Sequence, residues 1–135
     1  MADTKKSQIL QDGDRIAVMK FTDIYVDGGD EDAVLKVDVS EDLQAQSRSG
    51  AACTGVSIDC IWYVCSGVNV DILWDATADV LAWTLNGYGY FDFRSVGPLT
   101  NDSGSGKTGD IRFTTVGLGS GDRYSIMLKM TKSYE

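Results

Sequence analysis

The residues that most resemble a catalytic motif lie at 101–110, where NDSGSGKTGD contains Gly106-Lys107-Thr108. A phosphate-binding loop has the pattern G-x-x-x-x-G-K-[ST] and opens a helix whose N-terminus holds the phosphates. Here Asn101 stands where the first glycine is required, and residues 111–116 alternate like a strand. The sequence therefore predicts a flexible loop between strands instead of a nucleotide site.

A second group of candidate residues is acidic and lies between positions 23 and 32. Its carboxylates could bind calcium through their oxygens, although their spacing is not that of an EF-hand loop. The interpretation we favour is a solvated turn between strands, and calcium binding is the alternative. The residues concerned are Asp23, Asp27, Asp30, Glu31 and Asp32.

Cysteine and histidine chemistry is scarce in this chain. Cys53, Cys60 and Cys65 match no zinc spacing, and there is no histidine to complete a metal site. An odd number of cysteines also argues against a disulfide framework, so we expect three buried free thiols. Without histidine the commonest general base near neutral pH is missing. We predict a protein that is not an enzyme and has no cofactor or metal site.

Aromatic residues gather in the middle third of the chain. Tyr88 and Tyr90 alternate with glycines, which would leave their rings open on one side. Such rings can stack on sugars, anchor a protein interface, or cover the neighbouring glycines of a sheet. All three interpretations stay open at this point.

The elements that would carry these residues are strands. Apolar and polar residues alternate with period 2 from residue 15 onward, clearly at 68–74 and 124–131. Eight such runs, separated by glycine-rich turns, predict an all-β protein. A single jelly-roll-like β-sandwich over residues 14–135 is the first choice, an immunoglobulin-like sandwich the second, and residues 1–13 form an N-terminal arm.

Three local predictions follow from the same patterns. Asn86-Gly87 is the strongest two-residue hairpin signal in the chain. The nearly continuous apolar run at 58–65 is typical of a strand covered on both faces. Leu35, Val37 and Val39 should share one face, with Lys36 on the opposite one.

The charge of the chain limits its partners. The formal net charge is −8, with 20 acidic and 12 basic residues. An acidic surface repels phosphate backbones and anionic lipid heads, which argues against nucleic acid or membrane partners. The first 15 residues lack the apolar core of a secretory signal, so we expect synthesis in a cytoplasm without a signal peptide.

The C-terminal half resembles a known class of proteins. Asp-Phe-Arg at 92–94, Gly-Asp-Ile at 109–111 and Gly-Asp-Arg-Tyr-Ser-Ile at 121–126 are similar to the head decoration or cement proteins of tailed bacteriophages, which are small β-sandwich virion proteins. The resemblance implies a structural protein on the outside of the capsid, often a homotrimer. It implies the major capsid protein as partner and brings no catalytic residues.

On this basis we expect a protein that clamps neighbouring capsid subunits through many modest contacts. The contact candidates are Ile9 and Leu10 in the arm, and Tyr88 and Tyr90. Deleting residues 1–12 should leave a folded domain that attaches less well. The alternatives are a carbohydrate-binding or adhesion module, or another virion part such as a tail, collar or head-fibre subunit.

Overall fold

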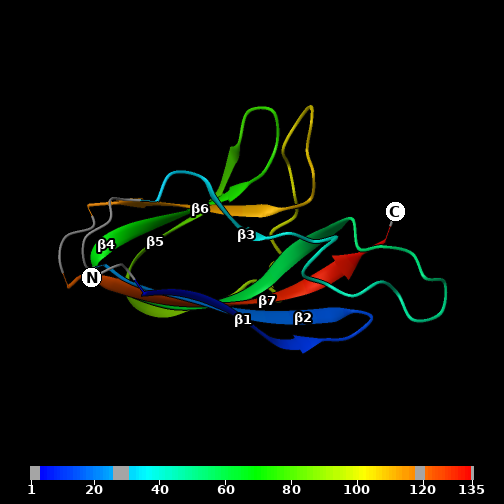
Figure 1. The fold of residues 1–135 in the computed structure, drawn as a ribbon, viewed down its shortest axis with the longest axis horizontal. Coiled ribbons are helices and arrows are strands. Elements are labelled where there is room, and N and C mark those ends of the chain that lie inside the picture. The colour runs from blue at the N-terminus through cyan, green and yellow to red at the C-terminus, as the bar shows by residue number, and fades with distance from the viewer. Residues whose placement is uncertain (1–3, 26–30, 118–120, 135) are drawn as a thin grey trace.

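The computed structural model describes residues 4–25, 31–117 and 121–134, and these residues form strands joined by turns and loops, without a helix (Figure 1). The all-β prediction is therefore confirmed. In chain order the strands are β1 (Thr4–Asp12), β2 (Ile16–Ile24), β3 (Val34–Val37), β4 (Gly55–Trp74), β5 (Val80–Asp92), β6 (Ile111–Val116) and β7 (Arg123–Ser133).

The seven strands belong to one antiparallel sheet, and β4 is its central strand, paired with β5, β6 and β7. Through residues 55–66 β4 pairs with β7, which continues to β2 and β1. Through residues 69–74 the same edge of β4 pairs with β6, which continues to β3, while β5 runs along the other edge. Because β4 changes partner along its length, the sheet curls into a half-barrel. In Figure 1, β3 and β6 lie above and β1, β2 and β7 lie below.

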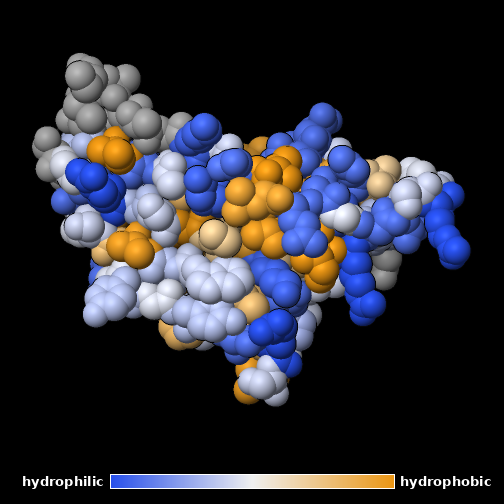
Figure 2. Space-filling view, turned by 90° about the horizontal axis from the view of Figure 1, so that it is seen from below, coloured by the Kyte–Doolittle hydropathy of each residue, from blue (hydrophilic) through white to orange (hydrophobic). Residues whose placement is uncertain are grey.

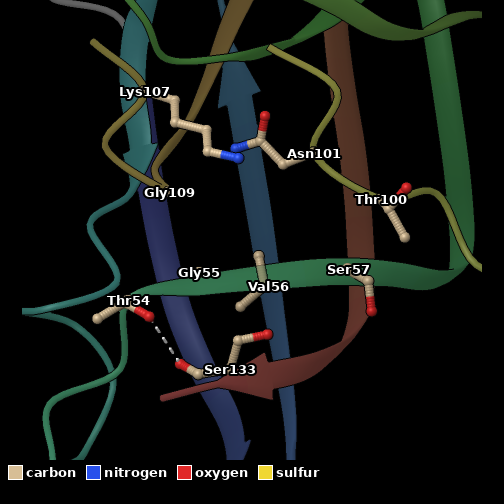
Figure 3. Close-up of a pocket in the computed structure, with 9 residues that line it drawn as sticks. All are labelled: Thr54, Gly55, Val56, Ser57, Thr100, Asn101, Lys107, Gly109 and Ser133. Atoms are coloured by element: carbon tan, nitrogen blue, oxygen red, sulfur yellow. Dashed lines mark hydrogen bonds between the residues drawn. The ribbon is translucent and has the colours of Figure 1, made fainter. Parts of the chain in front are cut away.

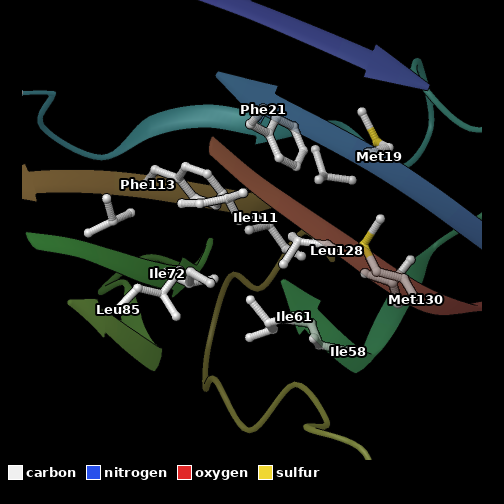
Figure 4. Close-up of a cluster of buried hydrophobic side chains, with 14 of the residues drawn as sticks. Met19, Phe21, Ile58, Ile61, Ile72, Leu85, Ile111, Phe113, Leu128 and Met130 are labelled. Carbon is white, nitrogen blue, oxygen red and sulfur yellow. The ribbon is translucent and has the colours of Figure 1, made fainter. Parts of the chain in front are cut away.

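The core fills the space inside this curl (Figure 4). The alternation predicted for the first and last strands of the domain is confirmed, because their apolar residues face inward. The ring of Phe21 on β2 meets the ring of Phe113 on β6 edge-on, with 5.1 Å between centroids, so the two sides of the curl are in contact. The inward apolar residues of β2 and β7 are Ala17, Met19, Phe21, Tyr124, Ile126, Leu128 and Met130, each at most 1% exposed.

The prediction of eight strands is wrong in its detail, because two predicted pairs of strands are continuous. The runs predicted at 58–65 and 68–75 both fall in β4, which ends at Trp74, and the runs predicted at 80–85 and 88–93 both fall in β5, which ends at Asp92. The hairpin at Asn86-Gly87 does not form. Gly87 has the positive φ (77°) that a hairpin turn would need, but it lies inside β5, opposite a wide bulge of β4 between Val64 and Asn69. Pairing of both halves with β4 outweighs the local turn preference.

The prediction that Leu35 shares the buried face of β3 with Val37, and that Lys36 lies on the opposite face, is also wrong. A register shift between Leu35 and Val37 reverses the alternation there. Lys36 points into the protein and is buried, whereas Leu35 is 42% exposed. Val37 and Val39 are buried as predicted.

The segment predicted as an N-terminal arm contains a strand. β1 pairs with β2 along its length and forms one edge of the sheet. At its end the Asp12 carboxylate accepts a 2.6 Å bond from the buried ammonium of Lys132. Burial alone would lower the pKa of Lys132, but the hydrogen bonds and charges of Asp12 and Tyr134 together outweigh this effect and raise the pKa. Deleting residues 1–12 would remove this partner, so that deletion changes the domain as well as the arm.

Candidate functional site

The loop that resembles a phosphate-binding motif connects β5 to β6, as the sequence predicts. Its polar groups hold it to the turn between β4 and β5. Thr108 donates its hydroxyl to the Asp75 carboxylate at 2.7 Å and its backbone N–H to the Asp75 carbonyl at 3.1 Å. Arg112 donates to the other carboxylate oxygen of Asp75 at 2.8 Å. The threonine hydroxyl that would serve a nucleotide therefore has a structural partner.

Gly109 shows how closely this loop is packed. Its φ is +87°, in the region that favours glycine. A Cβ atom at this position would overlap the backbone carbonyl of Thr54, which leads into β4. The glycine is thus required by close approach of two backbone segments and not by a bound phosphate.

A polar pocket of about 410 Å³ lies beside the loop (Figure 3). Lys107 and Asn101 point toward one another at its mouth, and Lys107 makes no ion pair among the described residues. One lysine with hydroxyl and amide groups suits a small polar or anionic group. The lining residues are Thr54, Gly55, Val56, Ser57, Thr100, Asn101, Lys107, Gly109 and Ser133.

The acidic group of residues 23–32 differs from a solvated turn. Asp27 and Asp30 lie outside the described residues, and Asp32 is exposed, but Asp23 and Glu31 are buried. Within the described part of the chain, no three His, Cys, Asp or Glu residues are grouped so that they could hold a metal ion. The buried members therefore need another explanation.

Glu31 belongs to a buried polar cluster that joins β3 to β7. Its carboxylate is 2.6 Å from the Lys36 ammonium and accepts a 2.6 Å bond from the Tyr124 hydroxyl. The Lys36 ammonium also lies 5.8 Å from the ring centroid of Phe113. Burial, and then the bond to Glu31, raise the pKa of Tyr124 far above its usual range. The charges of Glu31 and Lys36 thus compensate one another within the core, as buried charges require, which points to a structural role for this pair.

The four predicted contact residues are all exposed, but the structure divides them between two surfaces. Ile9 and Leu10 on β1 are 43% and 46% exposed. Ile9 lines an open groove of about 360 Å³ between the β1–β2 side and β3. Tyr88 and Tyr90 on β5 are 83% and 47% exposed and point to the outer face of the sheet, away from the groove that Ile9 lines.

We call the residues around these two tyrosines the outer strip: Trp62, Val64, Tyr88, Tyr90 and Met127. The register places them in adjacent cross-strand rows. Tyr90 is beside Trp62, which is beside Met127, and Tyr88 is beside Val64. Met127 continues to Lys20 on β2. A shallow hollow of about 180 Å³ lies over Trp62, Val64 and Met127, and Figure 2 shows apolar side chains gathered on this side of the molecule within a hydrophilic border.

The aromatic members of the outer strip are held in place. The rings of Trp62 and Tyr90 stack with 5.0 Å between centroids and 21° between planes. The Tyr90 hydroxyl lies 3.6 Å from the Cys60 sulfur. At the border, hydrogen bonds from Arg94 hold the pKa of the Asp92 carboxyl well below its usual range, so these two charges neutralise one another.

One interpretation of the aromatic cluster is that tyrosine rings cover the neighbouring glycines. In the structure the ring that covers a glycine belongs to Tyr63, and not to Tyr88 or Tyr90. A side chain at Gly89 would meet the Tyr63 ring on the inner face, with the nearest atom at 3.0 Å. Tyr63 in turn stacks on Phe91. Gly89 therefore leaves space for the Tyr63 ring, and Tyr88 and Tyr90 point away from this contact.

Sequence reasoning missed Trp62 and Val64 as surface residues. The apolar run at 58–65 predicts cover on both faces of the strand, yet Trp62 is 37% and Val64 55% exposed. The inner face is buried as predicted, with Ile61 fully buried. No signal in the sequence separates this face from a buried one, because an apolar run has the same composition whether the chain itself or a partner covers it.

The three cysteines are buried free thiols, as predicted. Burial raises the pKa of Cys65 to about 11, so its thiol stays protonated near neutral pH. No described segment forms a helix that is long and apolar enough to cross a membrane. A scan against protein-family models finds no match for the chain, and a search of curated proteins finds no significant match.

Proposed function

We propose that this chain is a non-enzymatic virion structural protein, a decoration or cement protein that binds the outer surface of a phage capsid and stabilises it. The outer strip is the observation that supports a binding role. It presents exposed aromatic and aliphatic side chains from β4 and β5, and its β4 members, Trp62 and Val64, belong to an apolar run with the composition of a buried strand. The sequence resemblance at 92–94, 109–111 and 121–126 supports the capsid as the place of binding.

The proposal includes the finer fold assignment of a jelly-roll-like sandwich, with an immunoglobulin-like sandwich as the alternative. The contact between Phe21 and Phe113 supports two facing layers. In this arrangement β1, β2, β7, the first half of β4 and the second half of β5 form one layer, and its outer face carries the strip. β3 and β6 form the other layer.

The physical basis of attachment is burial of the outer strip against the major capsid protein. Aromatic residues are enriched at the energetic centres of protein interfaces. Because Trp62 and Tyr90 are already stacked, they lose little conformational freedom on binding. Many copies, each with modest contacts to neighbouring subunits, would then hold the shell together.

A carbohydrate-binding module is the second candidate, and the exposed ring of Tyr88 favours it. The mutual stacking of Trp62 and Tyr90 weakens it, because each of these rings has one face covered. A glycan array separates the two: a sugar signal that disappears in Tyr88→Ser supports the module, and its absence favours the protein interface. Another virion part, such as a tail, collar or head fibre, would use the same strip at a lower copy number.

The copy number of the protein in purified particles tests the proposal. Quantitative mass spectrometry should find hundreds of copies per particle, in proportion to the major capsid protein. About a dozen copies or fewer would replace decoration by a tail or vertex role. Complete absence from the particles would contradict a virion function.

A further inference from the structure

The basic residues of this acidic chain are unevenly placed. The strand register puts four of them on the outer face of the sheet, the face that carries the outer strip. None of the four makes an ion pair with another residue of the described chain. The rest of the chain then has eight basic residues against 20 acidic ones. We call these four residues the basic flank: Lys6 on β1, Lys20 on β2, and Arg123 and Lys129 on β7.

The carboxylates near the basic flank are already bound to other groups. Asp92 is ion-paired with Arg94, with 2.8 Å between the charged atoms. Asp59 is buried and accepts a 2.6 Å hydrogen bond from the Thr131 hydroxyl. The register turns no other acidic residue of the described parts of β1, β2 and β7 toward this face. The outer face therefore carries local positive charge on a protein of negative net charge.

The basic flank borders the apolar hollow of the outer strip. Lys20 lines this hollow together with Trp62 and Met127. In the cross-strand row it stands two strands from Trp62, about 10 Å at the usual spacing of strands. Lys129 lies two residues beyond Met127 on the same face of β7, so it belongs to the next row. The two lysines are thus part of the hydrophilic border around the apolar side chains (Figure 2).

We propose that the partner surface bound by the outer strip is acidic, with an apolar side chain in the hollow and carboxylates opposite Lys20 and Lys129. This inference rests on the attachment proposed above and adds the chemistry of the partner, the major capsid protein. Unpaired lysines attract carboxylates and repel a basic surface. The acidic remainder of the chain is repelled by such a partner, so the outer face is the one that can approach it. Charge then selects the orientation of attachment.

A protein surface suits this face better than a nucleic acid or an anionic membrane. The hollow is lined by apolar side chains, and phosphate backbones and lipid head groups offer no apolar group to fill it. Trp62 and Tyr90 stack on one another, so each ring has one face closed to a nucleic acid base. The 20 acidic residues of the chain also oppose the approach of a dense polyanion. An acidic protein surface combines an apolar group with dispersed negative charge.

Binding to particles that lack the protein tests the charge of the partner. Lys20→Glu places a carboxylate beside the hollow, and we expect it to lower the association rate at least fivefold at low salt. Arg48→Glu is the matched control, because it changes the net charge equally at an exposed position on the loop between β3 and β4. It should bind like the unmodified protein. Raising the salt concentration from about 50 to about 300 mM should reduce the effect of Lys20→Glu, because salt screens exposed charges.

Neutralising the carboxylates of the particles gives the reciprocal measurement. After amidation with a carbodiimide and ethanolamine, the unmodified protein should bind more weakly, and its advantage over Lys20→Glu should disappear. Equal binding of Lys20→Glu and Arg48→Glu to untreated particles, or an advantage that survives amidation, would overturn the acidic partner and leave attachment itself in place. Failure of the unmodified protein to bind untreated particles would remove both proposals.

Two further probes distinguish carboxylates from phosphates as the partner of the basic flank. They are oligothymidylate and lipid vesicles that contain phosphatidylserine, and we expect the unmodified protein to bind neither. Binding of either probe that is lost in Lys20→Glu and kept in Arg48→Glu would assign the flank to a phosphate-bearing partner and overturn the proposal. Circular dichroism verifies that both variants are folded.

Discussion

The loop at 101–110 and the outer strip differ in two respects: how closely their residues resemble a catalytic motif, and how far their side chains are bound to other parts of the chain. The loop contains the only stretch of the sequence that resembles a catalytic motif, and the Thr108 hydroxyl in it donates a hydrogen bond to Asp75. The outer strip contains no reactive group, and its side chains are held in place but uncovered. The comparison shows that a binding site is better sought among side chains that stay exposed in the folded chain than among residues whose polar groups already bind one another.

The largest effect that separates the two regions is expected at Gly109. Gly109→Ala forces a side chain into the Thr54 carbonyl at a positive φ, which should lower the free energy of unfolding by about 3 kcal/mol or more. Urea denaturation measures it. Gly104→Ala is the matched control in the same loop, since open space surrounds that position. Equal stability of the two variants would show that the loop is not packed as described.

A smaller loss is expected when the anchor of the loop is weakened. Asp75→Asn removes the charge that binds both Thr108 and Arg112, and should cost about 2 kcal/mol of unfolding free energy. The control is Asp102→Asn, an exposed acid of the same loop. If the two substitutions shift the thermal unfolding midpoint equally, the network around Asp75 has no structural role.

The smallest effect is expected at the lysine of the motif. Lys107→Ala should change the unfolding free energy by less than about 0.5 kcal/mol, because Lys107 is exposed. Addition of ATP with magnesium should leave the melting temperature of the unmodified protein unchanged. A stabilisation by ATP that is lost in Lys107→Ala would restore the nucleotide hypothesis and reverse the comparison.

Regular alternation made much of the fold predictable. From Ala17 to Phe21 in β2 and from Tyr124 to Met130 in β7 every second residue is apolar, and those residues are the ones that the curled sheet buries. β1 could not be predicted in this way, because its pairing depends on the free edge of β2 and not on an apolar face of its own. The inward turn of Lys36 depends on a register shift and on the buried Glu31, whose other partner, Tyr124, is 93 residues away in the sequence.

The candidate site was predictable in part for a similar reason. Tyr88 and Tyr90 alternate with glycines, and the sequence alone suggests that their rings stay open. Trp62 and Val64 look like core residues, because an apolar run has the same composition whether the chain or a partner covers it. Only the position of β4 in the sheet reveals which of its faces the chain leaves exposed.

The most direct test of the outer strip as the attachment surface compares two valines of nearly equal exposure, Val64 at 55% inside the strip and Val116 at 52% on β6. Val64→Lys and Val116→Lys are each added to particles that lack the protein, and the bound fraction is measured at a subsaturating concentration. We predict at least a tenfold loss of binding for Val64→Lys and binding like that of the unmodified protein for Val116→Lys. Equal binding by the two variants would contradict the account.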